Sequence, residues 1–181
     1  MSDKVSFSFA SQTLEEISDY YKVMSDALRQ YYDVDNMHNP IPPRFIGLSR
    51  EELENELNER LNELDKNVSL SLLSAIEASL RIDYLNRVYQ RKKEDLSRAF
   101  RSIHKTTGNK ASLEEDILSS WKKYHPEYKS IFSDIMGALK YRHWLAHGRY
   151  WVPKLGRQYD FYSISIIAIR FYQDVPLVLV G

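Results

Sequence analysis

The chain has 181 residues, of which 43% are hydrophobic and 28% charged, a composition that suits one globular domain and excludes a disordered segment. It contains no Cys and only 6 Gly and 6 Pro, which excludes a disulfide framework, a thiolate metal site and an all-β fold with many tight turns. The formal net charge is zero, which argues against a general polyanion binder.

The two parts of the sequence carry opposite charge. Residues 1–80 hold 7 Lys or Arg and 15 Asp or Glu, a net of −8, whereas residues 81–181 hold 18 and 10, a net of +8. The second part therefore either builds a surface that attracts phosphate or packs against the first part and neutralises it. Because no apolar stretch is long enough to be a signal segment or a membrane span, we expect a cytoplasmic protein with no membrane partner.

Apolar residues at helical spacing dominate the first part of the chain. Residues 14–31 are predicted to form a helix that Ser11 or Thr13 can cap, and a Pro-rich connector follows over residues 33–47. A capping box of Ser49 and Glu52 then starts a long helix over about residues 49–91. Its stripe of Leu residues is either a coiled-coil seam or, as we favour, one face of an ordinary bundle.

The second part of the chain predicts shorter helices. One ends near Lys105, and a capping box of Ser112 and Glu115 starts the next, which ends before Pro126. A further helix begins near Glu127 and is terminated by Gly148.

The last segment, residues 159–174, is left open between strand and helix. Its β-branched and aromatic residues favour a strand, whereas its length and the lack of a partner strand favour a helix. The prediction is one all-α helical bundle over residues 1–181, with residues 1–48 as helix and connector and residues 49–175 as the core bundle.

Residues 142–148, Arg-His-Trp-Leu-Ala-His-Gly, combine titratable and cationic side chains in the last turns of a predicted helix. At ~100° per residue, His143 and His147 lie ~40° apart on one face, and Arg142 is long enough to reach that face. A His can move a proton near neutral pH, and an Arg can neutralise charge that builds on a phosphate. The segment therefore suits phosphodiester chemistry; the alternative is that His147 only bonds the free carbonyl groups of the helix end.

This segment, which we call the motif, resembles the signature of the HEPN superfamily: an Arg, four to six further residues, and a His. In that family a polar residue often follows the Arg, as His143 does here, and Ala-His-Gly is a frequent ending, as in Ala146-His147-Gly148. The stretch from Glu77 to Asp83 resembles the long helix of stand-alone HEPN proteins of the RiboL-PSP group, and the order of helices over about residues 50–175 is similar.

The resemblance implies a HEPN-like bundle that forms a homodimer through the motif helix, with two motifs facing each other. It also implies metal-independent cleavage of RNA to a 2′,3′-cyclic phosphate without a cofactor, with Arg142 and His147 catalytic and His143 supporting. Because in-line attack needs a base and an acid on opposite sides of phosphorus, two motifs around one phosphate suit this reaction.

The family also sets the alternatives for a biological role. Its nucleases act as toxins, which an antitoxin partner can control, or as antiviral defence effectors, and other members bind RNA, nucleotide or a partner protein without cutting. Some toxins carry a Tyr two residues after the motif His, where this chain has Arg149 and places Tyr150 one residue later.

Side chains near the motif each have two interpretations. Glu77 either orients Arg142 or His143, or pairs with Arg81 one turn away. The paired His residues at i and i+4 could bind a metal, but no third ligand is visible and Arg142 repels a cation, so we expect no metal site.

The segment after the motif is basic and aromatic. Arg149, Lys154 and Arg157 either hold flanking phosphates of a substrate or form a solvated loop. Tyr150, with Trp144 and Trp151, either stacks on a base or packs in the core or a dimer interface.

Overall fold

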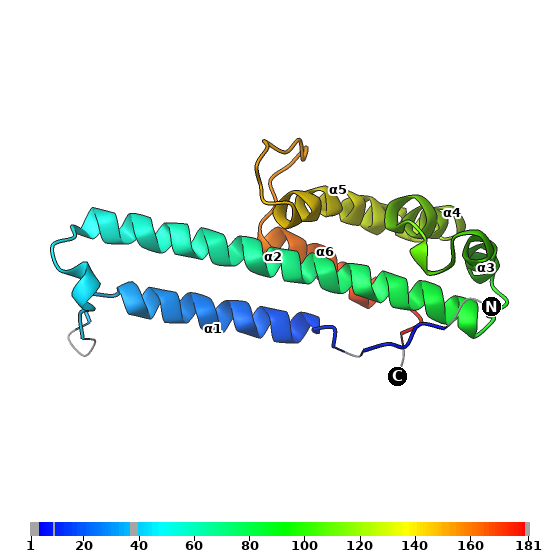
Figure 1. The fold of residues 1–181 in the computed structure, drawn as a ribbon, viewed down its shortest axis with the longest axis horizontal. Helices are drawn as coiled ribbons and strands as arrows, with labels where there is room; N and C mark the ends of the chain where they lie inside the picture. Colours follow the sequence, from blue (N-terminus) through cyan, green and yellow to red (C-terminus); the bar gives the residue numbers. More distant parts are fainter. Residues whose placement is uncertain (1–3, 9, 37–39, 180–181) are drawn as a thin grey trace.

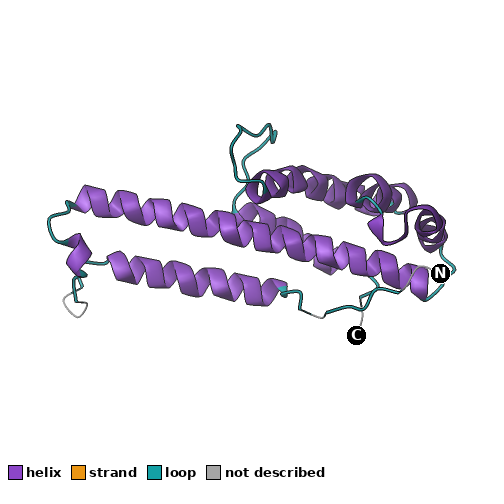
Figure 2. Ribbon diagram, in the orientation of Figure 1, coloured by secondary structure: helices purple, strands orange, loops and turns teal. Residues whose placement is uncertain are grey.

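Every regular element of the computed structural model is a helix, over the residues that it describes, 4–8, 10–36 and 40–179 (Figures 1 and 2). The α-helices are α1 Leu14–Tyr32, α2 Arg50–Tyr89, α3 Asp95–Thr107, α4 Ser119–Tyr124, α5 Lys129–Ala146 and α6 Phe161–Asp174. Short turns of helix are η1 Pro43–Phe45, η2 Gly108–Lys110, η4 Pro126–Tyr128 and the π-helical η3 Leu113–Leu118. The prediction of an all-helical fold is confirmed for this part of the chain.

The starts of the helices follow their local capping residues. Thr13, not Ser11, caps α1: its hydroxyl accepts from the backbone of Glu16, whose carboxylate accepts from the Thr13 N–H at 2.7 Å. The predicted capping box of Ser49 and Glu52 starts α2 in the same way. Such reciprocal bonds satisfy N–H groups that have no partner within the helix.

The third capping prediction, at Ser112, is only half right. The hydroxyl of Ser112 accepts from the N–H of Glu115 at 3.2 Å, as predicted. The carboxylate that accepts from the Ser112 N–H, at 2.7 Å, belongs to Asp116 instead of Glu115. The segment winds as the wider π-helix η3, which moves the returning side chain one residue along.

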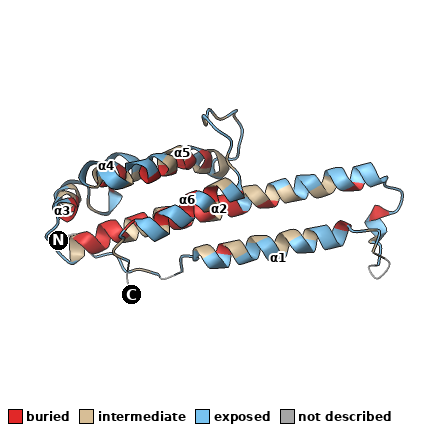
Figure 3. Cartoon of the chain, turned by 180° about the vertical axis from the view of Figure 1, so that it is seen from behind, coloured by how far each residue is buried: buried red, intermediate tan, exposed pale blue. Residues whose placement is uncertain are grey.

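The long helix α2 is the axis of the fold. Its 40 residues span about 60 Å, and it contacts α1, α3, α5 and α6. In Figure 1, α1 runs along one side of α2, while α5 and α6 cover only its C-terminal half. Burial follows this arrangement: every residue of the C-terminal half is buried or half-buried, whereas about half of the residues in the N-terminal half are exposed (Figure 3).

The buried residues form two separate clusters. The main core fills the space between α2 and the other helices, with Ile76 and Leu80 fully buried at its centre. A small second cluster of Tyr32, Phe45 and Leu53 closes the far end of the α1–α2 hairpin, where the connector turns. The hairpin tip is therefore held by its own few contacts, and the main core holds the rest.

The segment left open between strand and helix is the helix α6. Its start is capped by Asp160, which forms a box with Ser163, and the carboxylate of Asp65 in α2 accepts from the N–H of Phe161 at 3.0 Å. Its buried residues are spaced for a helix and include Phe161, Ile164, Ile167, Ala168 and Phe171. None of the described helices combines the length and the apolar character that a membrane span requires.

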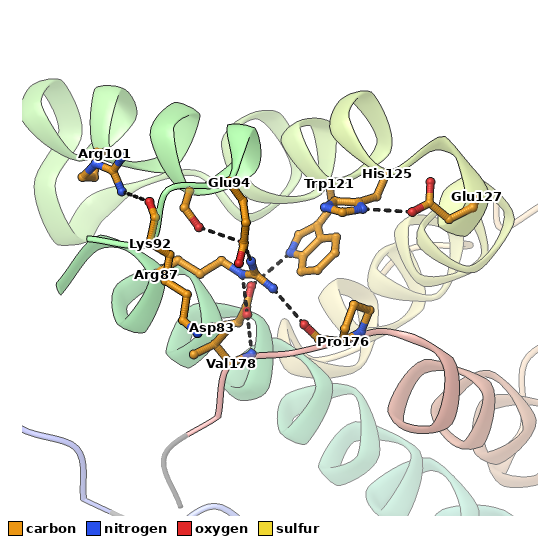
Figure 4. Close-up of polar contacts among 11 residues, drawn as sticks. Asp83, Arg87, Lys92, Glu94, Arg101, Trp121, His125, Glu127, Pro176 and Val178 are labelled. Atoms are coloured by element: carbon orange, nitrogen blue, oxygen red, sulfur yellow. Dashed lines mark hydrogen bonds and ion pairs between the residues drawn. The ribbon is translucent and has the colours of Figure 1, made fainter. Parts of the chain in front are cut away.

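A buried polar network holds the segment after α6 against α2 (Figure 4). Asp83 is fully buried and accepts from the N–H of Val178 at 2.6 Å, while Arg87 donates to the carbonyl oxygen of Pro176 at 2.8 Å. The Asp83 carboxylate also accepts from Arg87 Nε at 2.8 Å and from Trp121 Nε1 at 3.2 Å. One carboxylate thus joins α2, α4 and the C-terminal segment.

Two buried tyrosines are expected to resist ionisation. Burial raises the pKa of Tyr84 and of Tyr141 to about 12, above the ~10 of an unfolded tyrosine. Because the folded state keeps these hydroxyls neutral, their contribution to stability is complete below pH ~10 and is lost as the pH rises towards ~12. We expect the free energy of unfolding to fall over that range. The tyrosinate absorbance of these two residues should appear last in an alkaline titration, together with that of Tyr21, whose pKa burial also raises to about 12.

The matching variants are Tyr84→Phe and Tyr141→Phe, each of which should remove part of the late absorbance. A late phase that survives unchanged in both variants would contradict the assignment.

Candidate functional site

The motif lies at the C-terminal end of α5, where the chain leaves the helix for the loop that stands above the bundle in Figure 1. His147 is the C-cap residue, and Gly148 follows with φ +80°. The N–H of Arg149 then bonds the carbonyl oxygen of Trp144 at 3.2 Å, which closes the helix end in the manner of a Schellman motif. The prediction that Gly148 terminates this helix is confirmed.

The two imidazoles of the motif lie next to each other in solvent. His143 and His147 are both exposed, and their ring centroids are 4.3 Å apart. The ring of Trp151 lies 5.9 Å from that of His143. The indole N–H of Trp144 bonds the carbonyl oxygen of Trp151 at 2.7 Å, so the returning loop is tied to the same helix end.

Glu77 links two arginines across the site. Its Oε1 accepts from Arg81 Nε at 2.9 Å, and its Oε2 lies 3.0 Å from Arg142 Nη2. Glu77 therefore contacts both Arg81 and Arg142, because each carboxylate oxygen pairs with one guanidinium. The Nε of Arg142 is buried and has no hydrogen-bond partner among the described residues.

A hollow of about 320 Å³ lies beside Arg142. Arg142, His143 and Glu77 line it. Two further carboxylates, those of Glu114 and Glu115, also line it. We call Glu77, Arg81, Arg142, His143 and His147 the motif cluster; the hollow joins it to the start of η3.

The residues predicted to bind substrate do not converge on the motif cluster. Arg149 makes a two-pronged ion pair with Glu63 of α2, at 2.7 and 2.9 Å, which lowers the pKa of the Glu63 carboxyl. Arg157 lies 3.6 Å from Asp134. Lys154 and Tyr150 are exposed in the loop.

The charge asymmetry of the sequence is thus partly neutralised by ion pairs between the two parts of the chain. The pairs Arg149–Glu63 and Arg142–Glu77 each join a basic residue of the second part to an acidic residue of the first part. Glu63 was not identified from the sequence, because it lies 86 residues from its partner and no spacing rule connects them.

A column of aromatic rings holds the base of the loop on α5. Tyr141 stacks between Trp144 and Tyr159, with ring centroids 5.7 Å apart on both sides. The guanidinium of Arg157 lies over the ring of Tyr159 at 4.8 Å. Tyr159 in turn lies over Gly137, where an added Cβ would meet the tyrosine hydroxyl at 2.5 Å. Gly137 therefore leaves the space that the ring occupies.

This close approach predicts non-additive effects at two positions. Gly137→Ala should gain about 1 kcal/mol of helix propensity but lose about 1–3 kcal/mol to the displaced hydroxyl. In a Tyr159→Phe background the nearest ring carbon would be 3.8 Å from the new methyl group, an ordinary contact, so the same change should stabilise the protein. Denaturant unfolding of the four proteins of this double-mutant cycle measures the coupling. Equal effects of Gly137→Ala in both backgrounds would contradict the predicted contact.

Among the described residues, no third ligating side chain joins His143 and His147 in a group that could hold a metal ion. Comparisons of this chain with protein-family models, with curated proteins and with solved structures give no match.

Proposed function

We propose that this chain is a metal-independent endoribonuclease of the HEPN type, active as a homodimer with two motifs around one shared site. The observation that carries the proposal is the pair of exposed imidazoles, 4.3 Å apart, at the helix end where Arg142 and His143 line the same hollow. Imidazoles move protons near neutral pH, and a guanidinium stabilises charge on phosphate oxygens.

In the proposed reaction, the ribose 2′-hydroxyl attacks phosphorus and the bond to the 5′-oxygen breaks. His147 of one protomer takes the proton from the 2′-hydroxyl, and His147 of the second protomer gives a proton to the departing 5′-oxygen. The products are a 2′,3′-cyclic phosphate and a 5′-hydroxyl. Arg142 neutralises the non-bridging oxygens, and His143 supports its neighbour His147.

The contacts of Arg142 favour this role. Glu77 holds one end of the guanidinium at 3.0 Å, which fixes its position. Its buried Nε has no partner within the described chain, and an unused buried donor costs about 1–3 kcal/mol. A positioned guanidinium with spare donors suits an oxyanion.

The direct test is incubation of the protein with single-stranded RNA in excess chelator. Cleavage should persist, and the products should end in 2′,3′-cyclic phosphate. A substrate with 2′-deoxyribose at the cleaved nucleotide should resist, because it lacks the nucleophile. Cleavage that needs a divalent metal, or that cuts the deoxy substrate, would contradict the mechanism.

The shared site needs its own test. A heterodimer of the wild-type chain with the double variant Arg142→Ala/His147→Ala should lose nearly all activity if both copies serve one phosphate. Two independent sites would leave about half of the wild-type activity. A protein that is monomeric in light scattering at the assay concentration, yet active, would contradict the shared site.

A second candidate function is the non-catalytic binding of a partner protein. The hollow beside Arg142 is lined by three carboxylates, of Glu77, Glu114 and Glu115, against one guanidinium. Carboxylates repel phosphate and attract Lys or Arg side chains, so this hollow itself favours a basic segment of a partner. Failure to cut RNA, together with binding that Glu114→Gln and Glu115→Gln weaken, would support this function over the nuclease.

A further inference from the structure

A second cavity of the described chain shares one residue, Arg81, with the motif cluster. It has a volume of about 530 Å³ and lies along α2, between the N-terminal segment and the end of the C-terminal segment. Figure 1 shows both segments beside the C-terminal half of α2. The N–H of Val5 bonds the hydroxyl of Tyr89 at 3.1 Å, so one wall is held in place by a bond to α2. Cavities of this size commonly hold small organic ligands.

The cavity is lined by apolar side chains, by hydroxyl and amide groups, and by one charged group. No Asp or Glu among the described residues lines it, and Arg81 is its one cationic residue. Ser79 adds a hydroxyl, which is bonded to that of Tyr172 at 3.0 Å, and Asn109 adds an amide. The other residues with a polar group in the lining are Ser6, Ser8, Ser11 and Tyr84. The apolar lining residues are Val5, Phe7, Ala78, Ile82, Leu85 and Leu179.

Arg81 has donors left for a ligand. Its Nε donates to Glu77 at 2.9 Å and its Nη1 donates to the carbonyl oxygen of Ala111 at 3.2 Å. Its Nη2 has no partner in the part of the chain that the structure describes, and the side chain is 41% exposed. A guanidinium at the edge of an apolar cavity with no acidic residue in its lining is complementary to an organic anion.

We propose that this cavity binds an amphipathic organic carboxylate, with the aliphatic or aromatic body among the apolar residues and the carboxylate on Arg81. Such a ligand would also affect the motif cluster, because Arg81 belongs to both the cavity and the cluster. It shares Arg81 with Glu77, and Glu77 contacts Arg142, so binding changes the surroundings of the Arg142 guanidinium. This consequence is independent of whether the protein cuts RNA.

The test uses the whole protein and three probes: anilinonaphthalene sulfonate as a fluorescent reporter, and decanoate and decanol as competitors. Decanoate should displace the reporter in a saturable manner, and its affinity should be higher than that of decanol. Arg81→Gln should weaken decanoate about tenfold or more, which corresponds to the loss of a charge-assisted hydrogen bond, and leave decanol unchanged. The matched control, Arg98→Gln in α3, removes a guanidinium that does not line the cavity and should have no effect.

A second variant and a second readout make the result decisive. Ala78→Phe fills the cavity and should abolish the binding of both competitors while the helical circular dichroism is retained. The NMR signal of the Arg142 Nε–H should shift with decanoate in the wild type and not in Arg81→Gln. Equal affinity for decanoate and decanol, or binding that both variants leave unchanged, would overturn the proposal, as would the absence of saturable binding.

Discussion

Arg142→Ala is expected to lower the rate of RNA cleavage by about 10²- to 10³-fold, the usual cost of losing one group that stabilises developing oxyanion charge. Since the Arg142 side chain is one-third exposed and its ion pair with Glu77 lies near the surface, the free energy of unfolding should change little. Arg142→Lys should recover only part of the loss, because an ammonium cannot reproduce the planar donor pattern. Single-turnover cleavage of a short RNA measures the effect.

His147→Ala is expected to lower the same rate by about 10²- to 10⁴-fold, the range for a lost general acid or base. His125→Ala is the matched control, because His125 precedes α5 and lies at the opposite end of that helix from the motif. If Arg142→Ala and His147→Ala cut at the wild-type rate, the activity resides elsewhere and the nuclease proposal fails.

The second large effect is on stability. Asp83→Ala is expected to cost about 3–5 kcal/mol of unfolding free energy, because it removes the buried carboxylate that pairs with Arg87 and leaves this guanidinium only the half-exposed carboxylate of Glu94. It also removes the acceptor for the N–H groups of Trp121 and Val178. Asp95→Ala, which breaks an exposed pair with Arg98, is the control and should cost less than about 1 kcal/mol. Denaturant unfolding followed by circular dichroism measures both.

Replacing Arg87, the partner of Asp83, should lower the free energy of unfolding by an amount that depends on pH. Burial raises the pKa of Asp83, although Arg87 opposes this shift. In Arg87→Met that opposition is gone, so the pKa of Asp83 should rise further. A carboxyl whose pKa is higher in the folded state than in the unfolded state contributes its full stabilisation when the pH lies below the unfolded-state pKa. This contribution is lost as the pH rises through the folded-state pKa. The variant should therefore regain stability on mild acidification relative to the wild type, and an unchanged difference would contradict the assignment.

The sequence predicts best those features whose partners lie within one helical turn. The caps at Thr13 and Ser49 depend on residues three positions away, and the end of α5 depends on Gly148 itself. The box at Ser112 failed in part because a π-helical turn is a property of the local winding, which capping residues do not specify. The packing of the segment against its neighbours determines whether such a turn is α-helical or π-helical.

Glu77 and α6 show where sequence reasoning had to leave alternatives open. Spacing could not decide between Arg81 and Arg142 for Glu77, and the structure has both because a carboxylate offers two oxygens. In α6 the β-branched residues favoured a strand, yet Ile164, Ala168 and Phe171 share one helical face. Packing against α2 overrides the local preference there.

Contacts between distant parts of the chain were outside the reach of the sequence. Nothing in the spacing of Glu63 and Arg149, or of Asp83 and Val178, shows that they meet. The pair of Asp83 and Arg87 at i and i+4 in an apolar stretch was the one visible signal of the buried network. In other sequences, a charged pair one turn apart in the apolar part of a helix likewise indicates a buried polar network.

The small cluster of Tyr32, Phe45 and Leu53 has a consequence for local opening of the chain. Because its buried residues are distinct from those of the main core, although Leu28 packs against both, we expect the tip of the α1–α2 hairpin to unfold while the bundle stays intact. Amide hydrogens near Leu53 should therefore exchange with solvent far faster than those near Ile76, within one uninterrupted helix. A molecule that binds or unfolds the tip would therefore leave the structure of the motif cluster unchanged.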